Sequence, residues 1–130
     1  SIILSVPGKI GIYLRIILIS LIQQKFIKIS IQPGCYLIGI NNFILKKNVS
    51  IGLNSFLNAE KSSIVIGNNF SSNNNLHLNA AGGGKIKFGD DVLIGPNVVF
   101  RSGNHKTDKI KIPIRLQGNK YWDIIIGNNV

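Results

Sequence analysis

The sequence predicts an all-β solenoid of parallel strands preceded by an N-terminal α-helix. Two observations predict this fold: a composition rich in strand and turn formers, and an internal repeat. The 130 residues include 25 Ile, 16 Asn and 14 Gly. Ile favours strands, whereas Asn and Gly favour tight turns and tolerate positive φ. We therefore expect short strands joined by tight turns.

The repeat covers most of the chain after the first 25 residues. Three stretches align without gaps and begin at Leu45, Ile66 and Phe88, so that successive copies start 21 and 22 residues apart. A looser copy begins at Ile31, and another opens at Ile126. The apolar columns are Leu45/Ile66/Phe88/Ile126, Val49/Phe70/Val92/Val130 and Leu57/Leu78/Phe100, and Ala59/Ala80/Ser102 form a small-residue column. Coils with three short faces, stacked so that these columns line the interior, satisfy the pattern.

Two further columns mark the corners of the coils. One consists of Asn54, Asn75 and Asn97 and is polar throughout. The other consists of Gly52, Asn73 and Gly95. Since Gly and then Asn adopt the left-handed backbone conformation most easily, we expect that conformation in the second column.

The first part of the chain predicts a helix over residues 1–24, followed by a β-domain over 25–130 with a protruding loop at 104–122. Ser5 before Val6-Pro7 resembles a helix cap. The apolar segment 10–22 is shorter than the roughly 20 residues that a membrane span requires. The helix either covers the open end of the core or packs in a subunit interface. Alternatively it lies on an acidic membrane, with Lys9, Arg15, Lys25 and Lys28 facing lipid phosphates.

Charge and cysteine content narrow the possible functions. Fifteen basic residues against five acidic ones give a net charge of +10, which suits an anionic partner. The basic residues are spread along the chain without an aromatic and basic platform, so we expect no nucleic acid partner. The single cysteine, Cys35, excludes an internal disulfide framework and a cysteine-based zinc cluster.

The hexapeptide pattern carries a family resemblance over residues 45–130. It is seen in Ile66-Gly67-Asn68-Asn69-Phe70, in Gly89–Val98 and in Ile126-Gly127-Asn128-Asn129-Val130, with Gly103-Asn104-His105 and a loop between the last two. This arrangement resembles the hexapeptide-repeat O-acetyltransferases, which are left-handed parallel β-helices. It is most similar to those that acetylate maltose, galactosides, lipopolysaccharide or capsule sugars.

The resemblance implies a function as well as a fold. It implies a homotrimer with active sites between subunits, acetyl-CoA as the acyl donor, no metal, and a sugar or lipid-linked glycan as the acceptor. Such acceptors are made at the cytoplasmic face of the bacterial membrane, so we expect a cytoplasmic protein with peripheral membrane contact through the N-terminal helix. The chain ends within a repeat and lacks an initial Met, so we expect it to be a fragment. The resemblance implies that CoA lies along later coils and a C-terminal tail, so we expect the CoA-binding residues beyond Val130.

His105 matches the family's catalytic histidine, and an imidazole is suited to remove a proton from an attacking hydroxyl. The resemblance places Asn73 near the acceptor, although a turn residue would also suit its column.

The loop segment 112–118 resembles one found in polysaccharide-directed members. We expect Asn104, Arg115 and Gln117 to contact the acceptor, although Arg115 and Gln117, like Tyr121 and Trp122, could instead contact the neighbouring subunit. Asp108 could orient His105. The alternation of the strand directs His77 outward, towards an intersubunit face.

Two other functions are alternatives to acetyl transfer. A carbonic anhydrase on this scaffold requires three histidines around zinc, and the chain has only two. A non-catalytic glycan-binding or scaffolding β-solenoid remains the alternative, and it would not depend on His105.

Overall fold

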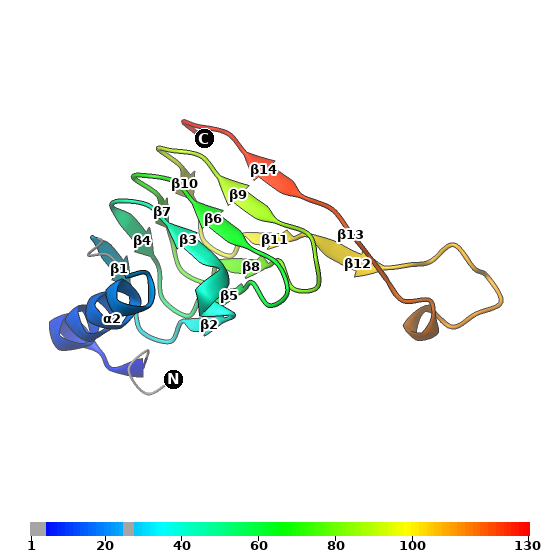
Figure 1. The fold of residues 1–130 in the computed structure, drawn as a ribbon, viewed down its shortest axis with the longest axis horizontal. Coiled ribbons are helices and arrows are strands. Elements are labelled where there is room, and N and C mark those ends of the chain that lie inside the picture. The colour runs from blue at the N-terminus through cyan, green and yellow to red at the C-terminus, as the bar shows by residue number, and fades with distance from the viewer. Residues whose placement is uncertain (1–4, 25–27) are drawn as a thin grey trace.

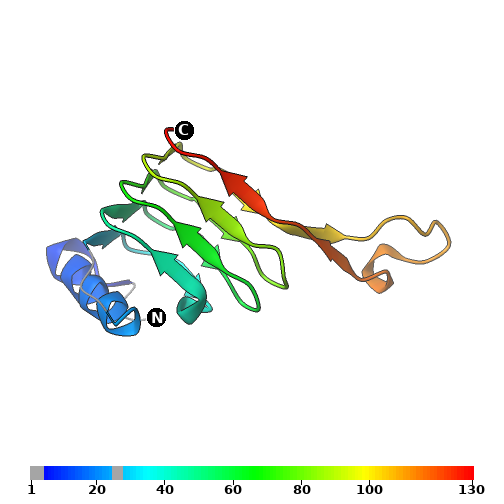
Figure 2. The same ribbon diagram turned by 45° about the horizontal axis from the view of Figure 1, so that its top comes forward.

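A computed structural model describes residues 5–24 and 28–130 and confirms the parallel solenoid with an N-terminal helix (Figure 1). Three four-stranded parallel sheets form its faces, and the chain visits each face once per coil. The first face contains β1 (Ile29–Ile31), β4 (Val49–Ile51), β7 (Ser71–Ser72) and β10 (Leu93–Ile94). The second contains β2 (Tyr36–Ile38), β5 (Phe56–Asn58), β8 (His77–Asn79) and β11 (Val99–Arg101). The third contains β3 (Phe43–Leu45), β6 (Ile64–Ile66), β9 (Ile86–Phe88) and β14 (Ile124–Ile126), and Figure 2 shows these strands side by side.

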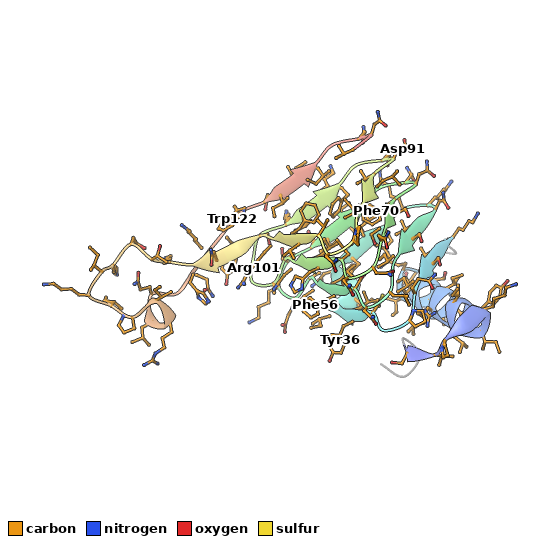
Figure 3. The ribbon with its side chains drawn as sticks, turned by 180° about the vertical axis from the view of Figure 1, so that it is seen from behind. Tyr36, Phe56, Phe70, Asp91, Arg101 and Trp122 are labelled. Atoms are coloured by element: carbon orange, nitrogen blue, oxygen red, sulfur yellow. The ribbon has the colours of Figure 1, made fainter. Side chains whose placement is uncertain are left out.

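The strand register confirms the predicted columns. Leu45 pairs with Ile66, Ile66 with Phe88, and Phe88 with Ile126. On the second face Leu78 lies between Leu57 and Phe100. Aromatic rings join the columns across the interior: the buried Phe88 is 5.1 Å from the buried Phe70 and 5.2 Å from the partly buried Phe100, with edge-to-face geometry in both pairs. Figure 3 shows Phe70 among the coils. Stacking of like side chains between coils therefore builds the core.

The predicted left-handed corner column is wrong by two positions. Asn54, Asn75 and Asn97 have φ of 56°, 60° and 61°, whereas Gly52, Asn73 and Gly95 are not among the residues with positive φ. Asn suits the left-handed position because its side chain also forms hydrogen bonds between successive coils. The Asn75 amide donates to Asn97 Oδ1 at 2.9 Å. Gly52 serves another purpose, since a Cβ there would lie 2.4 Å from the carbonyl carbon of Asn73.

The N-terminal helix, α2 (Gly8–Ile22), lies across the end of the solenoid beside β1 (Figure 1). Its N-cap residue is Pro7, without a side-chain cap, so the predicted cap at Ser5 is wrong. Arg15 is fully buried, which corrects the expectation that it faces lipid phosphates. Its guanidinium donates to the carbonyl oxygens of Ile31 and Val6. The buried side chains of Arg15 and Ile19 thus attach the helix to the first coil.

The predicted loop is a hairpin at its base. β12 (Gly103–His105) and β13 (Asn119–Tyr121) pair antiparallel and project from the solenoid between β11 and β14 (Figures 1 and 2). The tip contains a short 3-10 helix, η2 (Ile114–Leu116), and another, η1 (Ile40–Asn42), precedes β3. The hairpin carries His105 out of the core and into solvent.

Candidate active site

A polar cleft lies where the hairpin leaves the solenoid. Its volume is about 300 Å³. It is lined by the corners that follow β5 and β8 and by residues of β11, β12 and β13: Glu60, Lys61, Asn79, Ala81, Gly82, Arg101, Gly103, Asn104, His105, Asn119 and Tyr121. This volume is near the lower end of the range for small-molecule sites, about 300 to 1,000 Å³, so the cleft suits one small polar group.

His105 is held in the cleft by its backbone. It pairs with Asn119 across the hairpin, and its N–H donates to Asn104 Oδ1 at 2.8 Å. The next residue continues the ribbon, because the N–H of Lys106 donates to the Gly118 carbonyl oxygen at 2.9 Å. Within the described residues, no hydrogen bond to the imidazole is found. The imidazole is therefore exposed on a fixed backbone, where a nitrogen can accept a proton from a bound hydroxyl.

Tyr121 forms one wall of the cleft. Its ring lies directly against Gly82 and Gly103, where an added Cβ would come within 2.5 Å and 2.6 Å of ring atoms. Gly82 also has φ of +100°, which favours glycine. Asn119 Nδ2 lies 3.3 Å from the Tyr121 hydroxyl and donates to it. These glycines allow an aromatic ring to pack against the backbone beside His105.

The charges in the cleft come from two levels of the solenoid. Glu60 and Lys61 lie at the corner between β5 and β6, and Arg101 lies in β11 beside Asn79. Figure 3 shows Arg101 near the base of the hairpin. One carboxylate and two cationic side chains thus line the same cleft as the imidazole. A carboxylate can accept hydrogen bonds from sugar hydroxyls, and the cations suit an anionic group.

The structure places Asn104 and His105 in one cleft, but Asn73 lies elsewhere. Asn73 is an exposed corner residue between β7 and β8, and its Oδ1 accepts the N–H of Asn74 at 2.7 Å. His105 follows β11 at the opposite end of the second face. Within one chain the two residues do not share a site.

The remaining predicted residues lie along the hairpin, outside the cleft. Gln117 stabilises the tip: its amide donates to the carbonyl oxygens of Lys109 and Ile112 at 2.8 and 2.6 Å, and its Oε1 accepts the N–H of Lys109 at 3.0 Å. Arg115 is exposed in η2. Asp108 is exposed, and no hydrogen bond or ion pair joins it to His105 in the part of the chain that the structure describes.

No family model, curated protein or solved structure matches this chain. Among the described residues, no three His, Cys, Asp or Glu side chains gather as a metal site would require. No helix in the described ranges has the length and apolarity to cross a bilayer.

Glu60, Lys61, Asn79 and Arg101 were not predicted as site residues. The repeat alignment could have identified them. Ala59, Ala80 and Ser102 share a column, so the residues that follow each of them stack at one corner. Glu60 and Lys61 therefore lie on the same edge of the solenoid as Gly103-Asn104-His105.

Proposed function

We propose that this protein transfers an acetyl group from acetyl-CoA to a hydroxyl of a sugar or of a cell-surface polysaccharide precursor, with His105 as the general base. The observation that carries the proposal is the exposed imidazole of His105 in a polar cleft on a parallel β-solenoid. The hexapeptide pattern and the sequence Gly103-Asn104-His105 support it through their resemblance to O-acetyltransferases.

The chemistry is direct transfer between two bound substrates. The acceptor hydroxyl gives its proton to an imidazole nitrogen of His105 as its oxygen attacks the thioester carbonyl. The tetrahedral intermediate then collapses, an ester forms, and the carbon–sulfur bond breaks. The proton on His105 passes to the departing thiolate, which leaves as CoA, so that the base is regenerated.

The cleft suits a hydroxyl-rich acceptor. Glu60, Asn104 and Asn119 offer carboxylate and amide oxygens to sugar hydroxyls, and the Tyr121 ring offers an apolar surface for the face of a sugar. The about 300 Å³ of the cleft limits this contact to about one sugar unit. Lys61 and Arg101 favour an acceptor that carries phosphate or carboxylate groups.

A trimer would complete the site between subunits. On the outer surface of the second face, Tyr36 stacks on Phe56 at 6.2 Å and Phe56 stacks on His77 at 4.7 Å. Tyr36 is 56% exposed and Val99, at the end of the same row, is 64% exposed, so this row is available for contact with another copy. Such a contact would let the Asn73 corner of one subunit approach the His105 cleft of the next.

The test is CoA thiol release by the full-length protein with a panel of sugar acceptors. We expect acceptor-dependent release that falls at least about 100-fold in His105→Ala, because a general base contributes about that factor. In Glu60→Gln we expect a raised acceptor KM with a smaller change in kcat. Lys87→Ala, on the outer surface of the third face, is the control and should behave like the unaltered protein.

Release that is unaffected by His105→Ala would overturn the assignment of the base. An absence of release with every acceptor, together with glycan binding by the same protein, would favour a non-catalytic glycan-binding or scaffolding solenoid. Glycan arrays and the thiol assay, run on one preparation, distinguish these results.

A further inference from the structure

The outward side of α2 is an apolar stripe. Its exposed residues follow helical spacing on one side of the helix: Ile10 (73% exposed), Tyr13 (65%), Leu14 (39%), Ile17 (54%) and Leu21 (72%). The opposite side holds the buried residues Gly11, Arg15 and Ile19, and Arg15 donates to the Ile31 carbonyl oxygen of the first coil. The helix is therefore anchored by one side and presents a continuous apolar surface with the other.

Two lysines border this stripe. Lys9 and Lys28, both exposed, line a groove of about 370 Å³ between α2 and the first face of the solenoid. The rest of the groove is mainly apolar and includes Ile12, Tyr13 and Ile16. Apolar side chains beside paired lysines form a surface that can accept both hydrocarbon and phosphate.

The charge of the surrounding chain is entirely positive. Six basic residues and no Asp or Glu precede Glu60: Lys9, Arg15, Lys25, Lys28, Lys46 and Lys47. A symmetric contact between two copies through α2 would place lysines near lysines, with no carboxylate from this half of the chain to neutralise them. An anionic surface would pair with the same lysines favourably.

We propose that the exposed side of α2 binds the surface of an anionic membrane. Ile10, Tyr13, Leu14, Ile17 and Leu21 enter the boundary between headgroups and acyl chains, and Lys9 and Lys28 contact lipid phosphates. The 15 residues of α2 extend about 22 Å, less than the about 30 Å of a bilayer core, so the helix lies in the interface plane. This proposal does not depend on acetyl transfer.

Flotation of the full-length protein with lipid vesicles tests the proposal. One set of vesicles contains phosphatidylcholine alone, and the other also contains phosphatidylglycerol. We expect binding to the phosphatidylglycerol vesicles, weaker binding at raised salt, and at least about tenfold weaker binding to phosphatidylcholine alone.

Matched variants separate a specific surface from general stickiness. Ile10→Ser with Leu21→Ser should lower vesicle binding at least about tenfold. Leu93→Ser with Ile125→Ser removes one Leu and one Ile that are 73% and 71% exposed elsewhere, and should leave binding unchanged. Likewise Lys9→Glu with Lys28→Glu should abolish the preference for anionic vesicles, whereas Lys85→Glu with Lys87→Glu should preserve it. Thermal unfolding verifies that every variant is folded.

Three results would overturn the proposal: equal binding to both kinds of vesicle, no binding to either, or equal losses in the helix variants and their controls. Sedimentation velocity tests whether a second copy of the chain binds the stripe. If Ile10→Ser with Leu21→Ser dissociates an oligomer and leaves vesicle binding intact, a second copy of the chain covers the stripe instead.

Discussion

The Asp90 carboxylate accepts a 2.7 Å hydrogen bond from the backbone N–H of Asn68, which lies one coil earlier. The same oxygen also accepts from the Asn68 side-chain amide at 3.2 Å. In the same way, Asn68 Oδ1 accepts a hydrogen bond from the Lys47 N–H, and Asn128 Oδ1 accepts one from the Asp90 N–H. A row of side-chain oxygens thus joins successive coils at this corner.

The Asp90 bond predicts an acid dependence of stability. The Asn68 N–H stabilises the charged carboxylate and lowers the pKa of Asp90 below its ordinary value of 3.8, although burial acts in the opposite direction. A lowered pKa in the folded state means that the stabilisation is complete above the ordinary value. It is lost as the pH falls through the lowered pKa. We expect the Tm to fall below about pH 4, and to fall less in Asp90→Asn.

Scanning calorimetry between neutral and strongly acidic pH measures this difference. Asp108→Asn on the exposed hairpin is the control for loss of one carboxylate, and its Tm should follow that of the unaltered protein. Parallel Tm curves for Asp90→Asn and the unaltered protein would contradict the prediction.

A close contact between coils predicts that Gly52 does not tolerate a larger residue. A Cβ on Gly52 would lie 2.4 Å from the Asn73 carbonyl carbon. We expect Gly52→Ala to lower the free energy of unfolding by about 1–3 kcal/mol, since the coils must separate to accommodate the methyl group. Lys87→Ala, on the outer surface of the third face, is the control and should change it by less than about 0.5 kcal/mol. Urea unfolding compares the two variants, and similar losses in both would show that coil spacing is not the cause.

Sequence reasoning predicted the stacked core well because the physics of a solenoid is one-dimensional. Once Leu45, Ile66 and Phe88 were aligned, the register of the neighbouring strands followed, and the structure pairs them in that register. The alignment did not predict which corner position is left-handed. Gly and Asn occupy the Gly52 column and Asn alone occupies the Asn54 column, so both columns suit a left-handed residue. The choice depends on backbone spacing between coils and on amide bonds along the stack.

Only the residues of the candidate site that are neighbours in the sequence were predicted. His105 and Asn104 belong to a contiguous motif, so sequence alone could single them out. Glu60 and Lys61 lie two coils earlier and reach the cleft only because the corners superimpose. The hydrogen bonds that the Gln117 amide donates to the Lys109 and Ile112 carbonyl oxygens were not predicted, because they depend on how the hairpin tip folds back on itself.

The Gln117 bonds predict a local effect on the hairpin. Gln117→Ala removes three hydrogen bonds between the two sides of the tip. We expect faster amide hydrogen exchange in residues 106–118 and no change in the exchange of β5 and β8, because no core contact is lost. Arg115→Ala, in the same exposed turn, should leave the exchange rates as they are. Faster exchange throughout the solenoid would indicate that the tip supports the core.

Cys35 predicts a protected thiol. Its side chain is 3% exposed and donates to the Gly52 carbonyl oxygen at 3.2 Å. Burial raises the pKa of the Cys35 thiol, with the hydrogen bonds from Ser55 acting against it. Since the thiolate is the reactive form, alkylation should be at least about tenfold slower in the folded protein than in urea. Mass spectrometry of iodoacetamide labelling measures both rates, and a Leu93→Cys variant supplies an exposed thiol that should react rapidly when folded.

The hairpin leaves and rejoins the solenoid at adjacent points. The Trp122 N–H donates to the Ser102 carbonyl oxygen at 2.9 Å, and Asp123 Oδ1 accepts the N–H of Lys85 in the coil before at 2.9 Å. These two hydrogen bonds hold the fourth coil together at the base of the hairpin, independently of the residues between Ser102 and Trp122. In the proposed function the hairpin contacts the acceptor, so insertions, deletions or a transplanted hairpin would change recognition while these bonds still close the coil. Under that proposal recognition and folding are separable traits, and each could be altered by evolution or by engineering while the other is preserved.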